Sequence, residues 1–102
     1  MASFGHMSGK APAAEVQAMI KNGALVVDVR TADEYNSGHF PGALLIPHGE
    51  IGARLGELGA KDRPIVLYCR SGNRSGIALH ILESSGFTKA VNAGGYHEMP
   101  AP

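Results

Sequence analysis

Tryptophan is absent from this chain of 102 residues, and cysteine occurs only once, as Cys69. A single cysteine cannot form an internal disulfide, so the sequence excludes a disulfide-stabilised scaffold and leaves a thiol that is either simply kept reduced or is itself reactive. Long apolar runs are also missing, which argues against a membrane span. Nine basic and nine acidic residues give a formal net charge of zero. We therefore expect neither nucleic acid nor a membrane as a partner.

The N-terminal residues 1–10 have no apolar segment and no small-residue cleavage site, so they do not resemble a secretory signal peptide. Gly5-His6-Met7 within them is typical of a junction left by an expression vector. We expect a flexible extension over residues 1–10, followed by one domain over residues 11–102. A cytoplasmic location follows from this interpretation, while a periplasmic protein whose signal had been removed would have the same sequence.

The histidines are spread along the chain without the close spacing of a zinc site. They are His6, His39, His48, His80 and His97. We expect them to be surface or hydrogen-bonding residues, and we expect no metal and no cofactor.

Apolar residues form short continuous runs that alternate with segments of helical spacing. Continuous runs bounded by turn residues are typical of buried strands. We expect these strands at residues 24–27, 43–46, 64–68 and 90–91. Helical spacing and terminal signals predict helices over residues 12–22, 31–38 and 77–86, with an irregular or marginal helix over residues 48–59. This alternation predicts an α/β domain with a mostly parallel sheet between helix layers.

The sequence also predicts the start of one helix and the buried face of another. Thr31 and Glu34 have the spacing of a capping box, in which each residue satisfies a backbone N–H of the other. In the helix over residues 77–86, Ile77, Ile81 and Leu82 lie on an apolar face that Ala78 and Leu79 widen, and we expect this face to be buried.

Cys69 closes the strand over residues 64–68 and opens a polar loop that leads into a helix. Backbone N–H groups of such a turn converge on one point, the helix adds the positive end of its dipole, and Arg70 and Arg74 bracket the loop. Each of these features favours the thiolate, so we expect the pKa of Cys69 to lie below its usual value. The alternative is a buried structural cysteine, which leaves the charges and the glycine of the loop unexplained.

The spacing of Cys69 and Arg74 indicates which chemistry the thiolate performs. Four residues separate them, giving C-x4-R, whereas the cysteine phosphatases use the longer C-x5-R loop. A phosphate needs a ring of N–H donors wide enough for its oxygens, while one terminal sulfur needs only a tight nest. The shorter loop therefore favours a sulfur atom carried on the cysteine.

Several further motifs accompany this loop in a fixed order between about residue 24 and residue 95. They are Asp28-Val29-Arg30, Glu34-Tyr35, Gly38-His39-Phe40-Pro41-Gly42-Ala43, Ile46-Pro47, Tyr68-Cys69-Arg70-Ser71-Gly72-Asn73-Arg74-Ser75 and Gly94-Gly95. Together they resemble a single-domain rhodanese of the thiosulfate sulfurtransferase family. The resemblance implies a rhodanese-like α/β fold, with a mostly parallel five-stranded sheet flanked by helices on both faces, and a cysteine that forms a persulfide.

The resemblance assigns roles within the loop. Cys69 would be the sulfur acceptor, and the backbone N–H groups of residues 70–74 would surround the bound sulfur. Arg70 and Arg74 would attract the thiosulfate or sulfite anion.

The remaining loop residues are interpreted from their own chemistry. Ser71 and Ser75 can donate hydrogen bonds to the sulfur or the anion, although Ser75 could equally cap the following helix. Gly72 supplies a backbone angle that other residues resist, and Asn73 tolerates the same region.

Three residues outside the loop are interpreted as structural, and one expected residue is missing. Asp28, Arg30 and His39 belong to motifs that hold strand ends and turns, and an Asp-x-Arg at a strand end is more often an ion pair than part of a catalytic triad with Cys69. The family usually has a tryptophan shortly after its Gly-Gly pair. Tyr96-His97-Glu98-Met99 stands there instead, so the composition of that wall of the site is open.

The function predicted from these residues is ping-pong sulfur transfer from thiosulfate or another persulfide donor to cyanide or a thiol. The partners are then small molecules, with a protein as a further sulfur acceptor. Two alternatives stay open at this point. One is a non-enzymatic sulfur carrier or interaction module, because a persulfide loop does not specify the acceptor. The other, which the loop length disfavours, is a cysteine phosphatase or arsenate reductase of related architecture.

Overall fold

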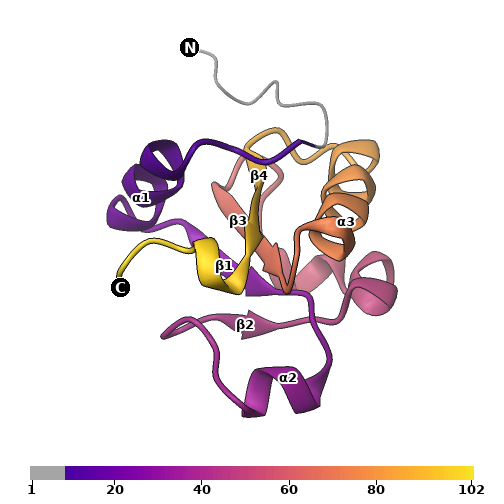
Figure 1. Ribbon diagram of the computed structural model, residues 1–102. Helices are drawn as coiled ribbons and strands as arrows, with labels where there is room; N and C mark the ends of the chain where they lie inside the picture. Colours follow the sequence, from indigo (N-terminus) through magenta and orange to yellow (C-terminus); the bar gives the residue numbers. More distant parts are fainter. Residues whose placement is uncertain (1–8) are drawn as a thin grey trace.

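The computed structural model describes residues 9–102 of the chain (Figure 1). Most of the extension expected over residues 1–10 lies outside the described residues. The α-helices are α1 (Ala13–Lys21), α2 (Ala32–Asn36) and α3 (Asn73–Ser84). The strands are β1 (Leu25–Asp28), β2 (Leu44–Leu45), β3 (Ile65–Cys69) and β4 (Ala90–Gly95). Three short 3-10 helices complete the fold: η1 (His48–Ala53), η2 (Leu55–Leu58) and η3 (Tyr96–Glu98).

The strands form one parallel sheet in the order β2-β1-β3-β4. Helices α1 and α3 lie on opposite faces of this sheet, as Figure 1 shows. α1 packs on one face against β3 and β4, while α3 and η1 pack together on the other. Because all strands run the same way, their carboxyl ends meet at one edge, where ligands of open α/β sheets usually bind. The sequence prediction of a parallel sheet between helix layers is confirmed.

The central strand β3 is buried on both sides, and its side chains alternate between the two cores. Leu67 and Cys69 belong to the core under α3, whereas Val66 and Tyr68 belong to the core under α1. Cys69 therefore faces the start of α3, and Tyr68 faces the opposite layer. A shift by one residue would exchange these environments, so the pleat of β3 decides where the thiol lies.

The expectation of five strands is wrong for the described residues, which form four. The N-terminal segment reaches the free edge of β4 but makes only one isolated parallel bridge there, between Lys10 and Asn92. The N–H of Ala11 donates to the carbonyl of Asn92 at 2.8 Å. Pro12 follows and has no N–H to continue the ladder. The chain turns into α1 at the next residue, so the fifth strand stops before it forms.

The helix after the cysteine loop also differs from its prediction. It begins at Asn73, and the residues it buries are Ser75, Ala78, Leu79 and Leu82. Ile77 was expected on the buried face, but it is 53% exposed. Ala78, Leu79 and Leu82 of the predicted face are buried, and with Ser75 they form a stripe spaced by three and four residues that meets the sheet. Ile77 lies outside that stripe and points outward.

Other predicted elements are present, although two of the strands differ in length from the prediction. The irregular helix expected over residues 48–59 is present as η1 and η2. The strand predicted at residues 90–91 is longer, because β4 runs through to Gly95. The strand predicted at residues 43–46 is shorter and only half-buried as β2, because it is an edge strand with one neighbour.

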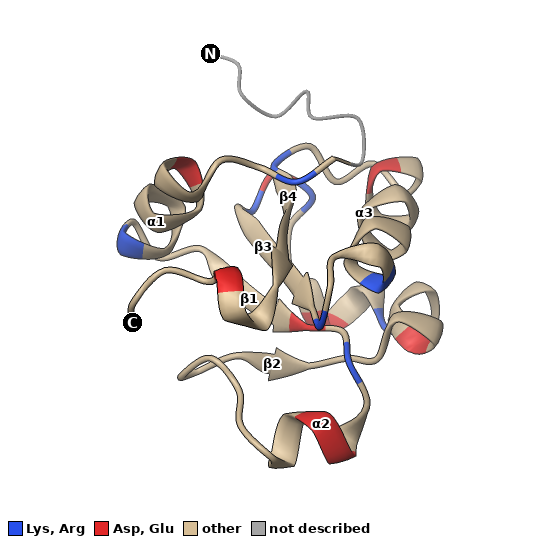
Figure 2. Ribbon diagram, viewed as in Figure 1, with Lys and Arg blue, Asp and Glu red and all other residues tan. Residues whose placement is uncertain are grey.

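Charged residues are spread over many elements, and Figure 2 shows basic and acidic segments meeting where the sheet faces α2. None of the helices within residues 9–102 has the length and apolar character needed to cross a membrane.

Candidate functional site

The candidate site lies at the carboxyl end of β3, where Cys69 ends the strand and α3 begins four residues later. Cys69 has no exposed surface. Gly72 precedes the helix with φ of 101° and ψ of −13°, a left-handed conformation that glycine adopts without steric cost. This confirms the backbone role predicted for Gly72. Asn73 does not share that conformation, because it is already the first residue of the helix.

Hydrogen-bond donors converge on the sulfur of Cys69. The backbone N–H of Gly72 donates to Sγ at 2.9 Å, and the Ser75 hydroxyl oxygen lies 3.3 Å from Sγ. Burial raises the pKa of Cys69, but the hydroxyl of Ser75 and the N–H groups of Ser75, Gly72 and Ser71 lower it by more, so the pKa lies below its usual value. The direction agrees with the prediction from the loop.

Ser75 does not cap α3, which has no side-chain cap at its N-terminus. Its hydroxyl is buried and lies 3.2 Å from the carbonyl oxygen of Gly72 and 2.6 Å from Oδ1 of Asn92. Because no capping side chain covers the first turn of α3, the N–H groups there remain directed at the loop.

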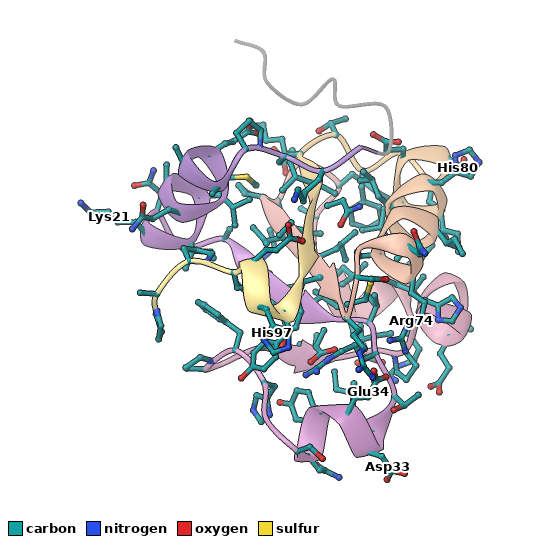
Figure 3. The ribbon with its side chains drawn as sticks, in the orientation of Figure 1. Lys21, Asp33, Glu34, Arg74, His80 and His97 are labelled. Carbon is teal, nitrogen blue, oxygen red and sulfur yellow. The ribbon has the colours of Figure 1, made fainter. Side chains whose placement is uncertain are left out.

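Arg74 is held by Glu34 of α2. Its Nη1 and Nη2 donate to the two carboxylate oxygens at 2.7 and 3.0 Å, and Figure 3 shows the two side chains pointing toward one another. Hydrogen bonds from Arg74, and then from Thr31, lower the pKa of Glu34 to about 2. The pKa of Arg74 is raised, first by Glu34 and also by the charge of Cys69. The guanidinium predicted to bind an anion is thus already paired with a carboxylate.

The side chains of Arg70, Ser71 and Asn73 lie at the surface. Arg70 lines a cavity of about 410 Å³ between the loop, α2 and η3, together with Tyr96 and His97. The structure therefore brings Gly72 and Ser75 to the sulfur, places Arg70 on the wall of a cavity that Cys69 itself does not line, and leaves the side chains of Ser71 and Asn73 exposed.

Asn92 is a site residue that the sequence did not predict, since the strand expected there ended at residue 91. Asn92 lies within β4 and is buried. Its Nδ2 donates to the carbonyl oxygen of Gly72 at 3.1 Å, and its Oδ1 accepts from the N–H of Gly94 at 2.9 Å. The sequence signal is a single amide side chain between the apolar residues Val91 and Ala93, two positions before Gly94. A polar side chain in an apolar strand needs specific hydrogen-bond partners.

The Gly-Gly pair allows β4 to approach the cysteine loop. A Cβ at Gly95 would lie 2.4 Å from the carbonyl oxygen of Arg70, and a Cβ at Gly72 would lie 3.3 Å from Cα of Gly94. Gly94 also has φ of 92°. Side chains at these positions would push the loop away from the sheet.

Asp28 and Arg30 form a buried ion pair, in agreement with their structural interpretation. Nη2 of Arg30 donates to Oδ2 of Asp28 at 2.7 Å and to the carbonyl oxygen of Gly38 at 2.7 Å. The Tyr68 hydroxyl also donates to Asp28 Oδ2 at 2.7 Å. Burial is the first cause of the raised pKa of Tyr68. The carboxylate is therefore satisfied within this group rather than by Cys69.

His39 and Tyr96 are the two remaining residues that the sequence singled out. Tyr96 lines the cavity beside Arg70, and His39 lies in the turn after α2. His39 stacks on Tyr35 with ring centroids 3.6 Å apart, and its Nδ1 lies 2.8 Å from the Tyr35 carbonyl oxygen. Tyr96, where the family usually has tryptophan, places its ring 4.7 Å from the Arg30 guanidinium and 5.7 Å from the Tyr68 ring. Tyr96 therefore supplies an aromatic ring to the cavity wall and contacts both Arg30 and Tyr68. Within residues 9–102, no three histidine, cysteine or acidic side chains lie together as potential metal ligands.

Comparison with known proteins places this arrangement among sulfur-handling domains. The family described as "Rhodanese-like domain" matches residues 12–100. The chain is 35% identical over 77 residues to thiosulfate sulfurtransferase PspE of Escherichia coli, covering 74% of each chain. It is 31% identical over 88 residues to thiosulfate sulfurtransferase GlpE of Pseudomonas savastanoi, covering 86% of this chain and 82% of that one. It is 40% identical over 67 residues to YrkF of Bacillus subtilis, which is named as a sulfur carrier protein. That match covers 66% of this chain but only 36% of YrkF.

Solved structures give the same relationship. A rhodanese with anions from E. coli is similar with a TM-score of 0.74 and 34% identity, covering 78% of this chain and 94% of that one. The human single-domain sulfurtransferase TSTD1 is similar with a TM-score of 0.77 and 29% identity, covering 87% and 92% of the two chains.

Proposed function

Because this chain belongs to the rhodanese-like domain family, we propose that it moves a sulfane sulfur from thiosulfate, or from another persulfide donor, to a thiophilic acceptor such as cyanide or a thiol. The sulfur would be carried as a persulfide on Cys69. The observation that carries this proposal is the gathering of groups able to donate hydrogen bonds, the N–H of Gly72 and the hydroxyl of Ser75, around one buried sulfur. They favour the thiolate, so the pKa of Cys69 is lowered despite its burial.

The reaction has two displacements. The thiolate of Cys69 attacks the outer sulfur of thiosulfate, a new S–S bond forms, the old one breaks, and sulfite leaves with the bonding electron pair. Cyanide or a thiolate then attacks the outer sulfur of the persulfide, and the Cys69 thiolate leaves. Covalent catalysis thus divides one sulfur transfer into two steps at the same atom.

The loop supports both displacements electrostatically. The N–H of Gly72 already donates to Sγ at 2.9 Å, and the open N-terminus of α3 adds positive potential near the bound sulfur. Arg70 lines the cavity between the loop, α2 and η3, and in this proposal it would meet the sulfite part of the donor. Arg74 contributes its charge while Glu34 holds its guanidinium. Since Cys69 has no exposed surface, the donor reaches the sulfur only after a local movement of the site.

The test is the intact mass of the protein before and after brief exposure to thiosulfate, followed by cyanide, with Cys69→Ser as the matched control. We expect the wild type to gain one sulfur atom, and cyanide to remove it with release of thiocyanate. Cys69→Ser should keep its fold, gain nothing and show no turnover. A wild type that gains no sulfur, or a Cys69→Ser variant with near-normal turnover, would overturn the proposal.

A sulfur carrier is the second candidate, supported by the similarity to YrkF. It would form the same persulfide but deliver it to a protein partner. Steady-state turnover with cyanide separates the two roles, because a carrier would load one sulfur readily and release it to small acceptors slowly. A phosphatase or arsenate reductase receives no support from the family match.

A further inference from the structure

Asn92 connects the cysteine loop to β4 through its side-chain amide. It is 4% exposed, and each end of its amide has partners within the protein. The Nδ2 end donates to the carbonyl oxygen of Gly72. The Oδ1 end accepts from the N–H of Gly94 and lies 2.6 Å from the Ser75 hydroxyl oxygen. An asparagine amide has donors at one end only and acceptors at the other, so these neighbours fix its orientation.

The fixed amide decides where the Ser75 proton lies. A hydroxyl has one proton to donate, and Oδ1 of Asn92 can only accept. The 2.6 Å contact between these two oxygens therefore requires the Ser75 proton to point at Asn92. The oxygen of Ser75 then presents a lone pair to Sγ of Cys69 at 3.3 Å. That arrangement suits a neutral thiol, whose S–H donates to Ser75.

We propose that Asn92 is a positioning residue that holds the Ser75 hydroxyl proton while Cys69 is a neutral thiol and releases it to the sulfur when the thiolate forms. When Cys69 loses its proton to water, the lone pair of Ser75 would face a negative sulfur. The hydroxyl turns, keeps its own covalently bound proton and points it at the thiolate. The hydrogen bond from Ser75 to Asn92 is lost, the one from Ser75 to Sγ forms, and the two oxygens move apart from their 2.6 Å contact. Asn92 retains the N–H of Gly94 as donor, and the S–H bond of Cys69 is the only covalent bond broken. The proposal rests on the proposed function for its purpose, since a thiolate is the attacking group there.

The charged groups around the sulfur do not supply this switch. Arg74 at the start of α3 interacts electrostatically with Cys69, but it is paired with Glu34. On the neighbouring strand, Asp28 and Arg30 are paired with one another. The strand on the other side contributes the neutral amide of Asn92. The rotating hydroxyl is therefore the group near the sulfur whose hydrogen bond changes with the charge of the thiol.

The first experiment titrates Cys69 by the pH dependence of its alkylation by iodoacetamide, because the thiolate is the reacting form. We compare wild type, Asn92→Ala, Ser75→Ala and the double variant. Removal of the Asn92 acceptor frees the Ser75 proton for the thiolate, so Asn92→Ala should increase the acid dissociation constant of Cys69. This increase should be about tenfold larger when Ser75 is present than when Ser75 has been replaced by alanine. Loosening of the loop affects both backgrounds equally and cancels in this comparison. Asn22→Ala, at an exposed asparagine after α1, is the matched control and should change nothing.

A second measurement needs no variant of Asn92 and so does not depend on that variant folding. The side-chain amide resonances of Asn92 should shift with the Cys69 titration in the wild type and stay nearly constant in Ser75→Ala. Equal effects of Asn92→Ala in both backgrounds, or an amide that titrates equally with and without Ser75, would overturn the proposal. Neither measurement uses a sulfur donor. A protein that fails to accept sulfur from thiosulfate can therefore still show the rotation of the Ser75 hydroxyl, and a protein that accepts sulfur can fail to show it.

Discussion

The buried ion pair at the end of β1 and the cysteine loop at the end of β3 lie on neighbouring strands but use polar groups in opposite ways. At β1, the carboxylate of Asp28 meets Arg30 and the Tyr68 hydroxyl, and the Tyr68 oxygen in turn accepts from the N–H of Phe40. Each charge has its partner inside the protein. At β3, N–H and O–H groups meet a sulfur atom without a paired cation directly bonded to it.

This difference distinguishes polar groups that hold the fold together from polar groups that support a reaction. The pair of Asp28 and Arg30 is complete in the resting protein, so further charge there would be repelled or left unpaired. The donors around Cys69 become fully used only when the sulfur carries negative charge or a second sulfur atom. A motif with two opposite charges at a strand end therefore holds the fold, while an excess of donors at the next strand end marks the reactive group.

The largest expected effect on stability comes from breaking the complete pair. Asp28→Asn keeps the shape of the side chain but leaves Arg30, which is 6% exposed, without a counter-charge. We expect the free energy of unfolding to fall by about 3–5 kcal/mol, measured by urea denaturation. Asp62→Asn, at an exposed acidic residue, is the matched control and should change stability by less than about 0.5 kcal/mol. A loss below about 1 kcal/mol for Asp28→Asn would contradict the structural role assigned to the pair.

A smaller effect is expected where the loop meets β4. In Gly95→Ala the new Cβ would lie 2.4 Å from the Arg70 carbonyl oxygen, so the loop backbone must move away. We expect the free energy of unfolding to fall by about 1–3 kcal/mol. The rate of sulfur transfer should fall by a larger fraction than the free energy of unfolding does, because the hydrogen-bond donors around Cys69 move with the loop. The measurements are urea denaturation and thiocyanate release.

Gly49→Ala is the control for this substitution, since a Cβ at Gly49 meets no atom within 4 Å. It should leave both stability and turnover near the wild-type values. If Gly95→Ala retained full turnover, the close approach of β4 would not be what holds the loop.

The sequence predicted those features of the site that depend on neighbouring residues. The capping box of Thr31 and Glu34 is present, with the Glu34 N–H 3.2 Å from the Thr31 hydroxyl oxygen and the Thr31 N–H 3.1 Å from the Glu34 carboxylate. The left-handed backbone at Gly72 and the donors at Cys69 were also predictable, because a short loop between a strand and a helix has few possible shapes.

Features that join distant segments were not predictable in the same way. The pairing of Glu34 with Arg74 spans 40 residues, and the contact of Asn92 with Ser75 spans 17. Each requires the sheet order and the angle of α3 to be known first. The exposure of Ile77 has the same origin, because a wide apolar helix face can pack in more than one orientation, and packing on the sheet selects the one that buries Ser75 and exposes Ile77.

The smallest effect is expected at Glu34, which links the two kinds of region by holding a loop arginine with a carboxylate. Glu34→Gln keeps an oxygen for the cap on Thr31 but removes the charge that faces Arg74. Because both side chains are about a quarter exposed, 25% for Glu34 and 27% for Arg74, we expect the free energy of unfolding to fall by less than about 1 kcal/mol at neutral pH.

The pH dependence of this effect follows from the pKa of Glu34, which is lowered to about 2 in the folded protein. The stabilisation by the Glu34 carboxylate is therefore complete above the usual carboxyl pKa and is lost as the pH falls through the folded value. The stability difference between wild type and Glu34→Gln should therefore be constant above about pH 5 and shrink toward about pH 2, with Glu83→Gln on the exposed side of α3 as a control that shows no such change. A difference that grew on acidification would mean that Glu34 is stabilised in its protonated form, and the loop arginine would then be free for an anion.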